Sequence, residues 1–254
     1  MKWWELSLDE FKNVDKSVAV LPVGIIEAHG PHLPLGTDAL MAIYVAEKAT
    51  EYANVLMLPP VWYGNTYVLD KFVGTISIDP RVLYELYKSI FMEAARNEVE
   101  YLVVVNGHGG NIDALSMAAK EATRSVDLTI VLVNWWIDLA KEARKAVLET
   151  PEGHAAEDET SEVMAAYPSL VKRVPIDGKS DEWVESRFRI YGKRVYDAEY
   201  HFAVQGYPSK ASQEKGRKIM DAAITELVAL LNDLKVGRLP LTSSPPFGEG
   251  SPRS

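Results

Sequence analysis

The chain has 254 residues, of which 47% are hydrophobic and 25% charged, and it contains no cysteine. Its length fits one large globular domain or two small ones, and the lack of cysteine excludes disulfides, thiolate metal sites and cysteine nucleophiles. The net charge of −9, without a basic run, argues against nucleic acid as a partner. No window approaches the ~20 apolar residues of a membrane span and the N-terminus lacks a signal-peptide pattern, so we expect a soluble cytoplasmic protein without a membrane partner.

Short apolar runs alternate with longer amphipathic segments up to residue 148. In chain order, the pattern predicts a strand at 17–23, a helix at 38–52, a strand at 54–58, a β-like piece at 74–78, a helix at 81–97, a strand at 101–105, a helix up to about 125, a strand at 128–133 and a helix at 135–148. This alternation predicts an α/β fold, with a mostly parallel sheet covered by helices on both faces.

The rhythm weakens beyond residue 150. A helix is expected at 159–166, strands or loops in the polar segment 177–200, and a long terminal helix at 212–234. The sequence shows no internal repeat and no change of composition that would divide it. We therefore expect a single domain over residues 1–235, followed by an extended tail at 236–254 that is rich in proline and serine.

Four of the five histidines stand beside glycines and carboxylates in loops where expected strands end: His29, His32, His108 and His154. Such loops converge at the carboxyl edge of a parallel sheet, where ligands bind. In the first loop, Glu27, His29 and Asp38 form a ligand set suited to zinc, manganese or iron(II), and a carboxylate can bridge two cations. Each residue alone has an ordinary explanation, such as a helix cap for Asp38, but together they favour a rigid metal site.

The second and third loops add further candidates. His108 lies in Asn-Gly-His-Gly-Gly-Asn (106–111), where Gly109 and Gly110 let the backbone approach a ligand closely. Alternatives are a cradle for a substrate phosphate or a tight turn around a satisfied histidine. In the third loop, His154 and Glu159 can supply a general acid and a metal ligand.

Other residues near these loops have a simpler explanation. The carboxylates Glu157, Asp158 and Glu162 read as the acidic first turn of a helix. Of the pair Trp135-Trp136, one ring is expected in the core and the other as a wall for a planar substrate. His201 is expected to be an ordinary packed or surface histidine.

Together, these motifs resemble those of the creatininase (creatinine amidohydrolase) family. The segment 21–38, with Glu27-Ala28-His29-Gly30-Pro31-His32 at its centre, is similar to the family signature, and 106–111 and 154–161 are similar to its second and third motifs. The stretch 206–216 also fits, so the resemblance covers about residues 3–235. It implies a three-layer αβα sandwich with a dinuclear metal centre that hydrolyses non-peptide C–N bonds of the amide type.

The resemblance also implies roles for individual residues. Glu27 and His108 would hold one divalent ion and His29 the other, with Asp38 bridging them; His154 matches the catalytic histidine. Creatininase itself has a glutamate at the position of Gly110, so we expect Glu159 to complete the second site or to orient the water. The ions would be zinc, manganese or iron(II), with a hydroxide held between them as the nucleophile.

Two departures make creatinine a doubtful substrate. Thr150 stands where creatininase has its creatinine-binding tryptophan, and Val68-Leu69 replaces a common Glu-His pair. The family also includes a formylamino-pyrimidine ribosyl phosphate deformylase of flavin and deazaflavin biosynthesis and a peptidase that trims a peptide-derived redox cofactor, and residues 106–111 look closer to these branches.

We therefore predict a metal-dependent amidohydrolase acting on a small cyclic amide or formamide. Its substrate would contact Trp135, Trp136, Gly109 and Gly110, and the chain would form a homo-oligomer, as family members usually do. The alternatives are the deformylase reaction, or a non-catalytic protein that binds metal or nucleotide on the same fold.

Overall fold

The computed structural model describes residues 1–173, 176–178 and 201–239. At its centre lies a four-stranded parallel sheet with the order β2-β1-β3-β4. The strands are β1 (Val18–Val23), β2 (Leu56–Met57), β3 (Tyr101–Asn106) and β4 (Thr129–Asn134). Every residue of β1, and all of β3 except the partly exposed Tyr101, is buried. Continuous apolar runs such as these are expected for strands that are covered on both faces.

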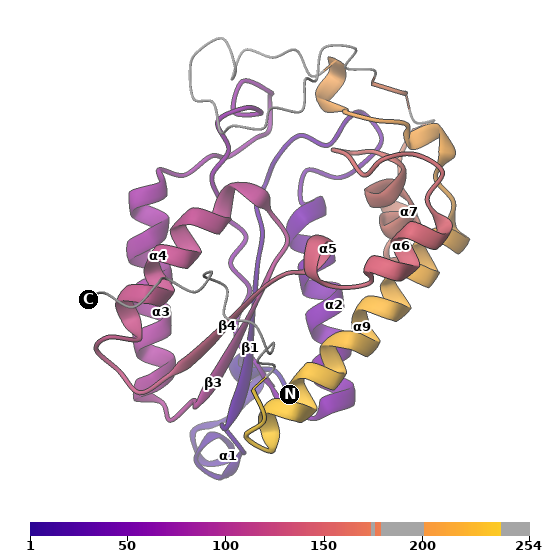
Figure 1. The fold of residues 1–254 in the computed structure, drawn as a ribbon. Coiled ribbons are helices and arrows are strands. Elements are labelled where there is room, and N and C mark those ends of the chain that lie inside the picture. The colour runs from indigo at the N-terminus through magenta and orange to yellow at the C-terminus, as the bar shows by residue number, and fades with distance from the viewer. Residues whose placement is uncertain (174–175, 179–200, 240–254) are drawn as a thin grey trace, which may run out of the picture.

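Helices cover both faces of the sheet, as Figure 1 shows. The helices are α1 (Leu8–Asn13), α2 (Thr37–Ala53), α3 (Pro80–Arg96), α4 (Ile112–Ala122), α5 (Trp135–Asp138), α6 (Lys141–Val147), α7 (Glu157–Ala166) and α9 (Gln213–Lys235). Val18 and Val20 of β1 pack with α2 and α9, whereas Ala19 and Leu21 pack with α3 and α4. Side chains of a strand alternate between the two faces, so each face has its own core. The predicted three-layer αβα sandwich is therefore confirmed.

Some predicted elements differ from the observed ones. The expected helix at 135–148 is two helices, α5 and α6, because Ala140 between them adopts a left-handed conformation (φ 57°) and its N–H donates to Glu226 of α9. The β-like piece at 74–78 contributes isolated bridges at Ile76 and Ser77. Residues 179–200 and 240–254 lie outside the described residues, so most of the polar segment and of the expected tail does too, and the single domain over 1–235 stays a prediction.

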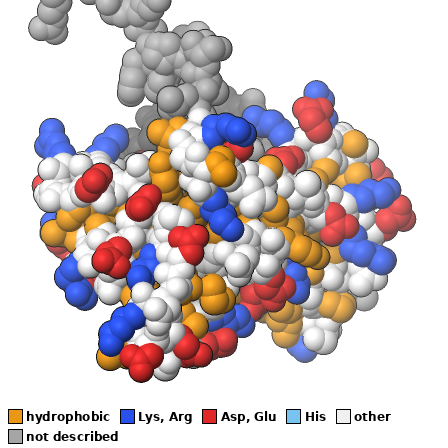
Figure 2. All heavy atoms as spheres, turned by 90° about the horizontal axis from the view of Figure 1, so that it is seen from below, with side chains coloured by type: hydrophobic (Ala, Val, Ile, Leu, Met, Phe, Trp, Pro, Cys, Tyr) orange, Lys and Arg blue, Asp and Glu red, His pale blue; other side chains and the backbone are white. Residues whose placement is uncertain are grey.

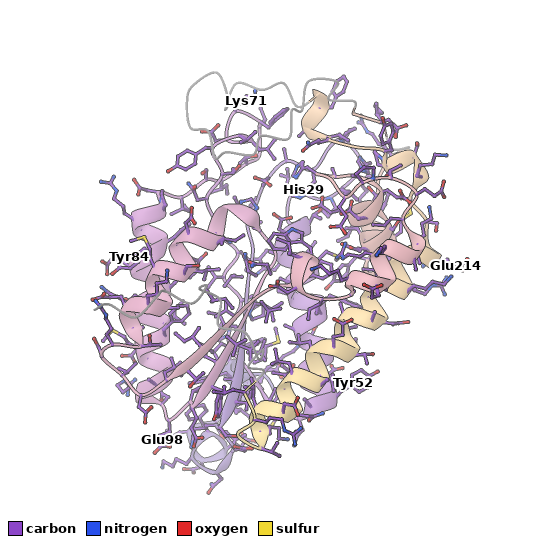
Figure 3. All side chains as sticks on the ribbon, in the orientation of Figure 1. His29, Tyr52, Lys71, Tyr84, Glu98 and Glu214 are labelled. Atoms are coloured by element: carbon purple, nitrogen blue, oxygen red, sulfur yellow. The ribbon has the colours of Figure 1, made fainter. Side chains whose placement is uncertain are left out.

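The two ends of the sheet present different surfaces. His29 lies near the end toward which the strands run, and Tyr52 and Glu98 lie toward the other, as Figure 3 shows. Figure 2 views the molecule from the end where Tyr52 and Glu98 lie. On this face, lysine and arginine side chains are interspersed with acidic and hydrophobic ones, and neither charge forms a continuous patch. No helix in the described part of the chain is long and apolar enough to cross a membrane.

Candidate metal centre

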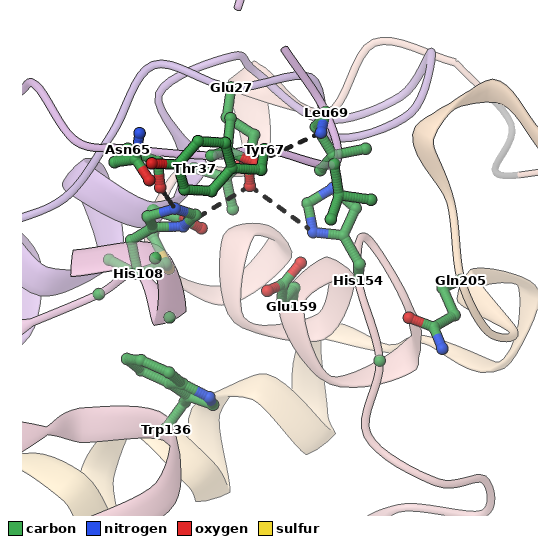
Figure 4. Close-up of a pocket in the computed structure, with 18 of the residues that line it drawn as sticks. Glu27, Thr37, Asn65, Tyr67, Leu69, His108, Trp136, His154, Glu159 and Gln205 are labelled. Atoms are coloured by element: carbon green, nitrogen blue, oxygen red, sulfur yellow. Dashed lines mark hydrogen bonds and ion pairs between the residues drawn. The ribbon is translucent and has the colours of Figure 1, made fainter. Parts of the chain in front are cut away.

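All five predicted metal ligands and His154 meet above the carboxyl ends of β1 and β3. Figure 4 shows Glu27, His108, His154 and Glu159 of this cluster. Glu27 and His29 come from the loop after β1, and Asp38 comes from the first turn of α2. His108 directly follows β3, and Glu159 lies in the first turn of α7. These segments are far apart in the sequence, and the parallel sheet brings them together because its strands end at one edge.

Asp38 belongs to two groups of possible ligands. One contains Glu27, Asp38 and His108, and the other contains His29, Asp38 and Glu159; in each, the ligand atoms lie within 4.8 Å of one another. Asp38 Oδ1 is 2.9 Å from His29 Nε2, and Asp38 Oδ2 is 2.8 Å from His108 Nδ1. The two oxygens of one carboxylate therefore face two different histidines, which is the arrangement needed for a bridging ligand.

The chemistry of this donor set fits divalent cations. Glu27 Oε2 is buried and has no hydrogen-bond partner in the described part of the chain, and His29 Nε2 is buried with the Asp38 carboxylate 2.9 Å away. Buried polar atoms without partners are costly, and so are buried carboxylates without a counter-charge. Glu27 and Asp38 are both almost fully buried beside the third carboxylate, Glu159. Cations held by this set would give the buried Glu27 oxygen a partner and neutralise the carboxylates.

Hydrogen bonds to backbone carbonyls orient His29 and His108, the two candidate histidine ligands. His29 Nδ1 lies 3.0 Å from the carbonyl oxygen of Glu27, and His108 Nε2 lies 2.8 Å from that of Asn65. A carbonyl only accepts, so these nitrogens carry the hydrogen. The opposite nitrogens, His29 Nε2 and His108 Nδ1, then point at the carboxylates. Histidines that bind metals are commonly oriented in this way.

The carboxylates raise the proton affinity of both histidines in the metal-free protein. Burial alone would lower the pKa of His29, but Asp38, Glu159 and Glu27 outweigh it and raise the pKa to about 10. Burial is likewise outweighed at His108, where Glu27 and Asp38 raise the pKa to about 9. Burial and the nearby Asp38 raise the pKa of Glu159 to about 7. In the metal-free protein, protons on His29 and His108 thus supply the positive charge that a metal ion would otherwise bring to the carboxylates.

His154 has a different environment from the two other histidines. Its Nε2 lies 2.8 Å from the carbonyl oxygen of Ala28, its Nδ1 is 3.9 Å from Glu27 Oε1, and its ring stacks on His29 with centroids 4.2 Å apart. Burial and the charge of His29 lower the pKa of His154 to about 4, so its ring is neutral at pH 7. The donor atoms of His154, Glu27 and His29 form a third close group, so the geometry allows His154 both as a ligand and as a proton carrier.

The cluster forms one wall of a cavity of about 970 Å³. Both tryptophans line the cavity. Trp135 is buried with its ring against Arg144, whereas Trp136, labelled in Figure 4, is half-buried. Gly109 and Gly110 also line the cavity. A Cβ at Gly110 would lie 1.8 Å from the carbonyl oxygen of Asn65, so the close approach that requires a glycine there is to this loop.

Glu157 and Asp158 lie in the acidic first turn of α7, as expected, whereas Glu162 lies beyond that turn, and all three are buried. Glu157 is fully buried and accepts hydrogen bonds from backbone N–H groups of the preceding loop and from Lys215 of α9. Asp158 and Glu162 are buried beside the guanidinium of Arg144, at 3.9 Å and 2.8 Å. Sequence reasoning missed Arg144 because a lone arginine in a helical pattern reads as a surface residue.

Sequence reasoning also missed Asn65 and Gln205. Asn65 acts through its backbone carbonyl, which every residue type offers, so the sequence holds no signal for it. Gln205 pairs with the backbone of His154 through two hydrogen bonds, N–H to O at 3.0 and 2.8 Å, and lines the cavity. The proline- and glycine-containing stretch that follows Gln205 was noted in the sequence, but its contact with the third loop was not.

Three of the relatives found by comparison with known proteins show what the chain is similar to. The chain is 30% identical to a creatinine amidohydrolase of Pseudomonas putida over 172 residues, which are 61% of this chain and 66% of that protein. It is 31% identical to a mycofactocin precursor peptide peptidase of Mycobacterium tuberculosis, with 82% of each chain aligned. It is 36% identical over 112 residues to a 2-amino-5-formylamino-6-ribosylaminopyrimidin-4(3H)-one 5'-monophosphate deformylase of Methanothermobacter thermautotrophicus, 42% of this chain and 47% of that protein.

A solved structure and a family model point to the same family as these relatives. The solved structure of a manganese creatininase superposes with a TM-score of 0.77 at 25% identity, covering 91% of this chain and 97% of that one. The family model for creatininase, described as creatinine amidohydrolase, matches residues 4–231. A match over so much of the sequence, together with the shared fold, shows that this chain belongs to the creatininase family.

Proposed function

We propose that the chain is a metal-dependent amidohydrolase that cleaves a C–N bond of a small cyclic amide or formamide. The observation that carries this proposal is Asp38, whose two oxygens face two histidines belonging to two ligand groups. Two divalent cations, zinc, manganese or iron(II), would be held by Glu27, Asp38 and His108 and by His29, Asp38 and Glu159. When bound, they would polarise the scissile carbonyl and make a water molecule nucleophilic near neutral pH.

We assign Glu159 as the ligand that replaces the glutamate expected at the position of Gly110. Glu159 Oε2 lies 3.7 Å from His29 Nε2 and accepts a hydrogen bond from the N–H of Ala155 at 2.6 Å, which holds the carboxylate in place. A glutamate at residue 110 would collide with the backbone of Asn65. The fifth ligand therefore comes from α7.

His154 is the proton carrier in this proposal. Its Nε2–H donates to the carbonyl of Ala28, so Nδ1 presents the lone pair on the side of Glu27. This Nδ1 takes the proton released by the attacking water and passes it to the leaving nitrogen. A positioned general acid–base group of this kind contributes about 10²–10⁴-fold to the rate.

The cavity supports a substrate larger than a single five-membered ring. Its volume of about 970 Å³ is near the upper end of the range for small-molecule sites, and Trp136 offers one flat wall. This favours the deformylase reaction as the second candidate, because the relative with that name acts on a pyrimidine carrying a ribosyl phosphate. The peptidase relative makes a short peptide the third substrate to test.

The test is hydrolysis by protein that has been stripped of metal and reloaded separately with zinc, manganese and iron(II). Creatinine, a formylamino-pyrimidine and short peptides serve as substrates, and release of amine or formate is measured. Asp38→Ala, purified in the same way, controls for contaminating hydrolases. Metal-dependent release by the wild-type chain alone supports the proposal. Tight metal binding without hydrolysis of any substrate would instead favour a non-catalytic metal-binding protein.

A further inference from the structure

Asn111 occupies the N-cap position of α4 but does not cap that helix. Asparagine is one of the preferred N-cap residues, because its side-chain oxygen accepts a hydrogen bond from the first turn. Here the side chain is fully buried and turned toward two other loops. Its Nδ2 donates to the carbonyl of Gly24 at 3.0 Å, and its Oδ1 accepts from the N–H of Asn65 at 3.2 Å. The helix therefore has no side-chain cap. Instead, the side chain of Asn111 links the loop that contains Gly24 to the loop that contains Asn65.

The same Asn65 contacts a proposed metal ligand. Its carbonyl oxygen lies 2.8 Å from His108 Nε2, and its side-chain Nδ2 donates to the carbonyl of Ile78 at 2.9 Å. The peptide of Asn65 is thus fixed by Asn111 on its N–H side, and its carbonyl holds the ring of His108. Among the described residues, Asn65 is the hydrogen-bond partner on the Nε2 side of the ring and Asp38 the partner on the Nδ1 side.

We propose that Asn111 is a positioning residue. It holds the backbone of Asn65 in place, and that backbone determines which ring nitrogen of His108 faces Glu27 and Asp38. This inference rests on the proposed metal centre. With Nε2–H committed to the carbonyl, Nδ1 is left 2.8 Å from Asp38 and 3.6 Å from Glu27. If the carbonyl moved, the ring could turn and present either nitrogen, and the ligand group would lose its geometry.

Two glycines make this connection close. A Cβ at Gly64 would lie 2.6 Å from Asn111 Oδ1, and a Cβ at Gly110 would lie 1.8 Å from the carbonyl oxygen of Asn65. Side chains at either position would push the linked groups apart. Glycine is therefore needed at both positions for Asn111, Asn65 and His108 to keep their hydrogen-bond distances.

Asn111→Ser separates this role from a merely structural one. Serine keeps a small polar side chain but lacks the amide group that makes both hydrogen bonds, so the variant loses the connection to Asn65. The backbone of Asn111 is already helical (φ −83°, ψ −19°), so the substitution neither adds nor removes a helix cap. The matched control is Asn134→Ser. Asn134 also occupies an N-cap position without capping, at the same edge of the sheet, and its Oδ1 accepts from Asn106. The side chain of Asn106 bonds the backbone of His108 and not its ring, so this control tests the backbone route to His108 separately from the route through Asn65.

Two measurements on the full chain test the proposal: zinc affinity, by competition with a chelator, and the ¹⁵N chemical shifts of histidine rings in the zinc-loaded protein. For the wild type we expect His108 to bind zinc through Nδ1 and to keep a slowly exchanging proton on Nε2. Asn111→Ser should lower zinc affinity about 10–100-fold, the usual effect of losing an outer partner of a metal ligand, and should speed exchange of the Nε2 proton. Asn134→Ser should resemble the wild type in both.

The possible results discriminate clearly. Wild-type zinc affinity and an unchanged His108 spectrum in Asn111→Ser would overturn the positioning role. Equal losses in Asn111→Ser and Asn134→Ser would overturn it as well, because the effect would not depend on Asn65. Failure of the wild-type chain itself to bind zinc would overturn the metal centre, and with it this inference.

Discussion

Adding one methyl group at Gly110 should disturb the site, whereas the same change at Gly109 should not. A Cβ at Gly110 would lie 1.8 Å from the carbonyl oxygen of Asn65 and 2.6 Å from His108 Nε2, while the nearest atom to a Cβ at Gly109 is 4.0 Å away, in Trp136. Neither glycine has a positive φ, so the two substitutions differ only in the space available. Backbone must move by more than about 1 Å at Gly110 before ordinary contact distances are restored, and His108 must move with it.

Overpacking costs about 1–3 kcal/mol, and we expect Gly110→Ala to lose about 2–3 kcal/mol of unfolding free energy because the obstacle is backbone. For a chain of this size that corresponds to a fall in Tm of roughly 5–10 °C. Zinc affinity should fall about 10–100-fold, since the carbonyl that holds His108 is displaced. Circular dichroism during heating and competition with a chelator measure the two effects. If Gly110→Ala and Gly109→Ala behaved alike, the tight approach of this loop to Asn65 would be refuted.

Three further predictions concern the site. Asp38→Ala should lose metal from both ligand groups, because its oxygens serve each, and elemental analysis that still found two ions per chain would contradict a bridging role. His154→Ala should keep its metal and lose about 10²–10⁴-fold in turnover, whereas His108→Ala should lose metal; normal turnover in the first would remove His154 from catalysis. The free energy of unfolding of the metal-free protein should decrease between pH 7 and 10. His29 and His108 have pKa values of about 10 and 9 when folded, above the usual 6.5, so their protonation stabilises the fold below pH 6.5 and the benefit is lost as pH rises through 9 and 10. Denaturant titrations across this range should show the decrease, and a flat profile would contradict it.

The parts of the fold that sequence could predict are those governed by local pattern. The buried strands β1 and β3 are nearly continuous runs of valine and leucine, and such runs are typical of the centre of a parallel sheet. The break between α5 and α6 is different, because it depends on Ala140 bonding to Glu226, 86 residues away. Apolar periodicity continues through this point in the sequence, so no local signal announces the break.

The candidate site divides in the same way. Glu27, His29, Asp38 and His108 could be singled out because their chemistry is in their side chains and strand ends converge in space. Asn111 could not, since its position before a helix suggests capping and only the packed loops show what its side chain contacts. The burial of Glu157 was equally hidden, because its partner Lys215 lies on α9.

The close packing of α7 against α9 has a consequence for the order in which the site matures during synthesis. The first ligand group is complete once residue 108 has left the ribosome, together with the three strands that support it. The second group needs Glu159, on a helix anchored by Lys215 and so tightly apposed to α9 that a Cβ at Gly216 would lie 1.8 Å from the carbonyl of Ser161. If the proposed centre binds two cations, the residues of one ligand group are therefore synthesised before those of the other, and we expect the second ion to bind only after the last helix has docked.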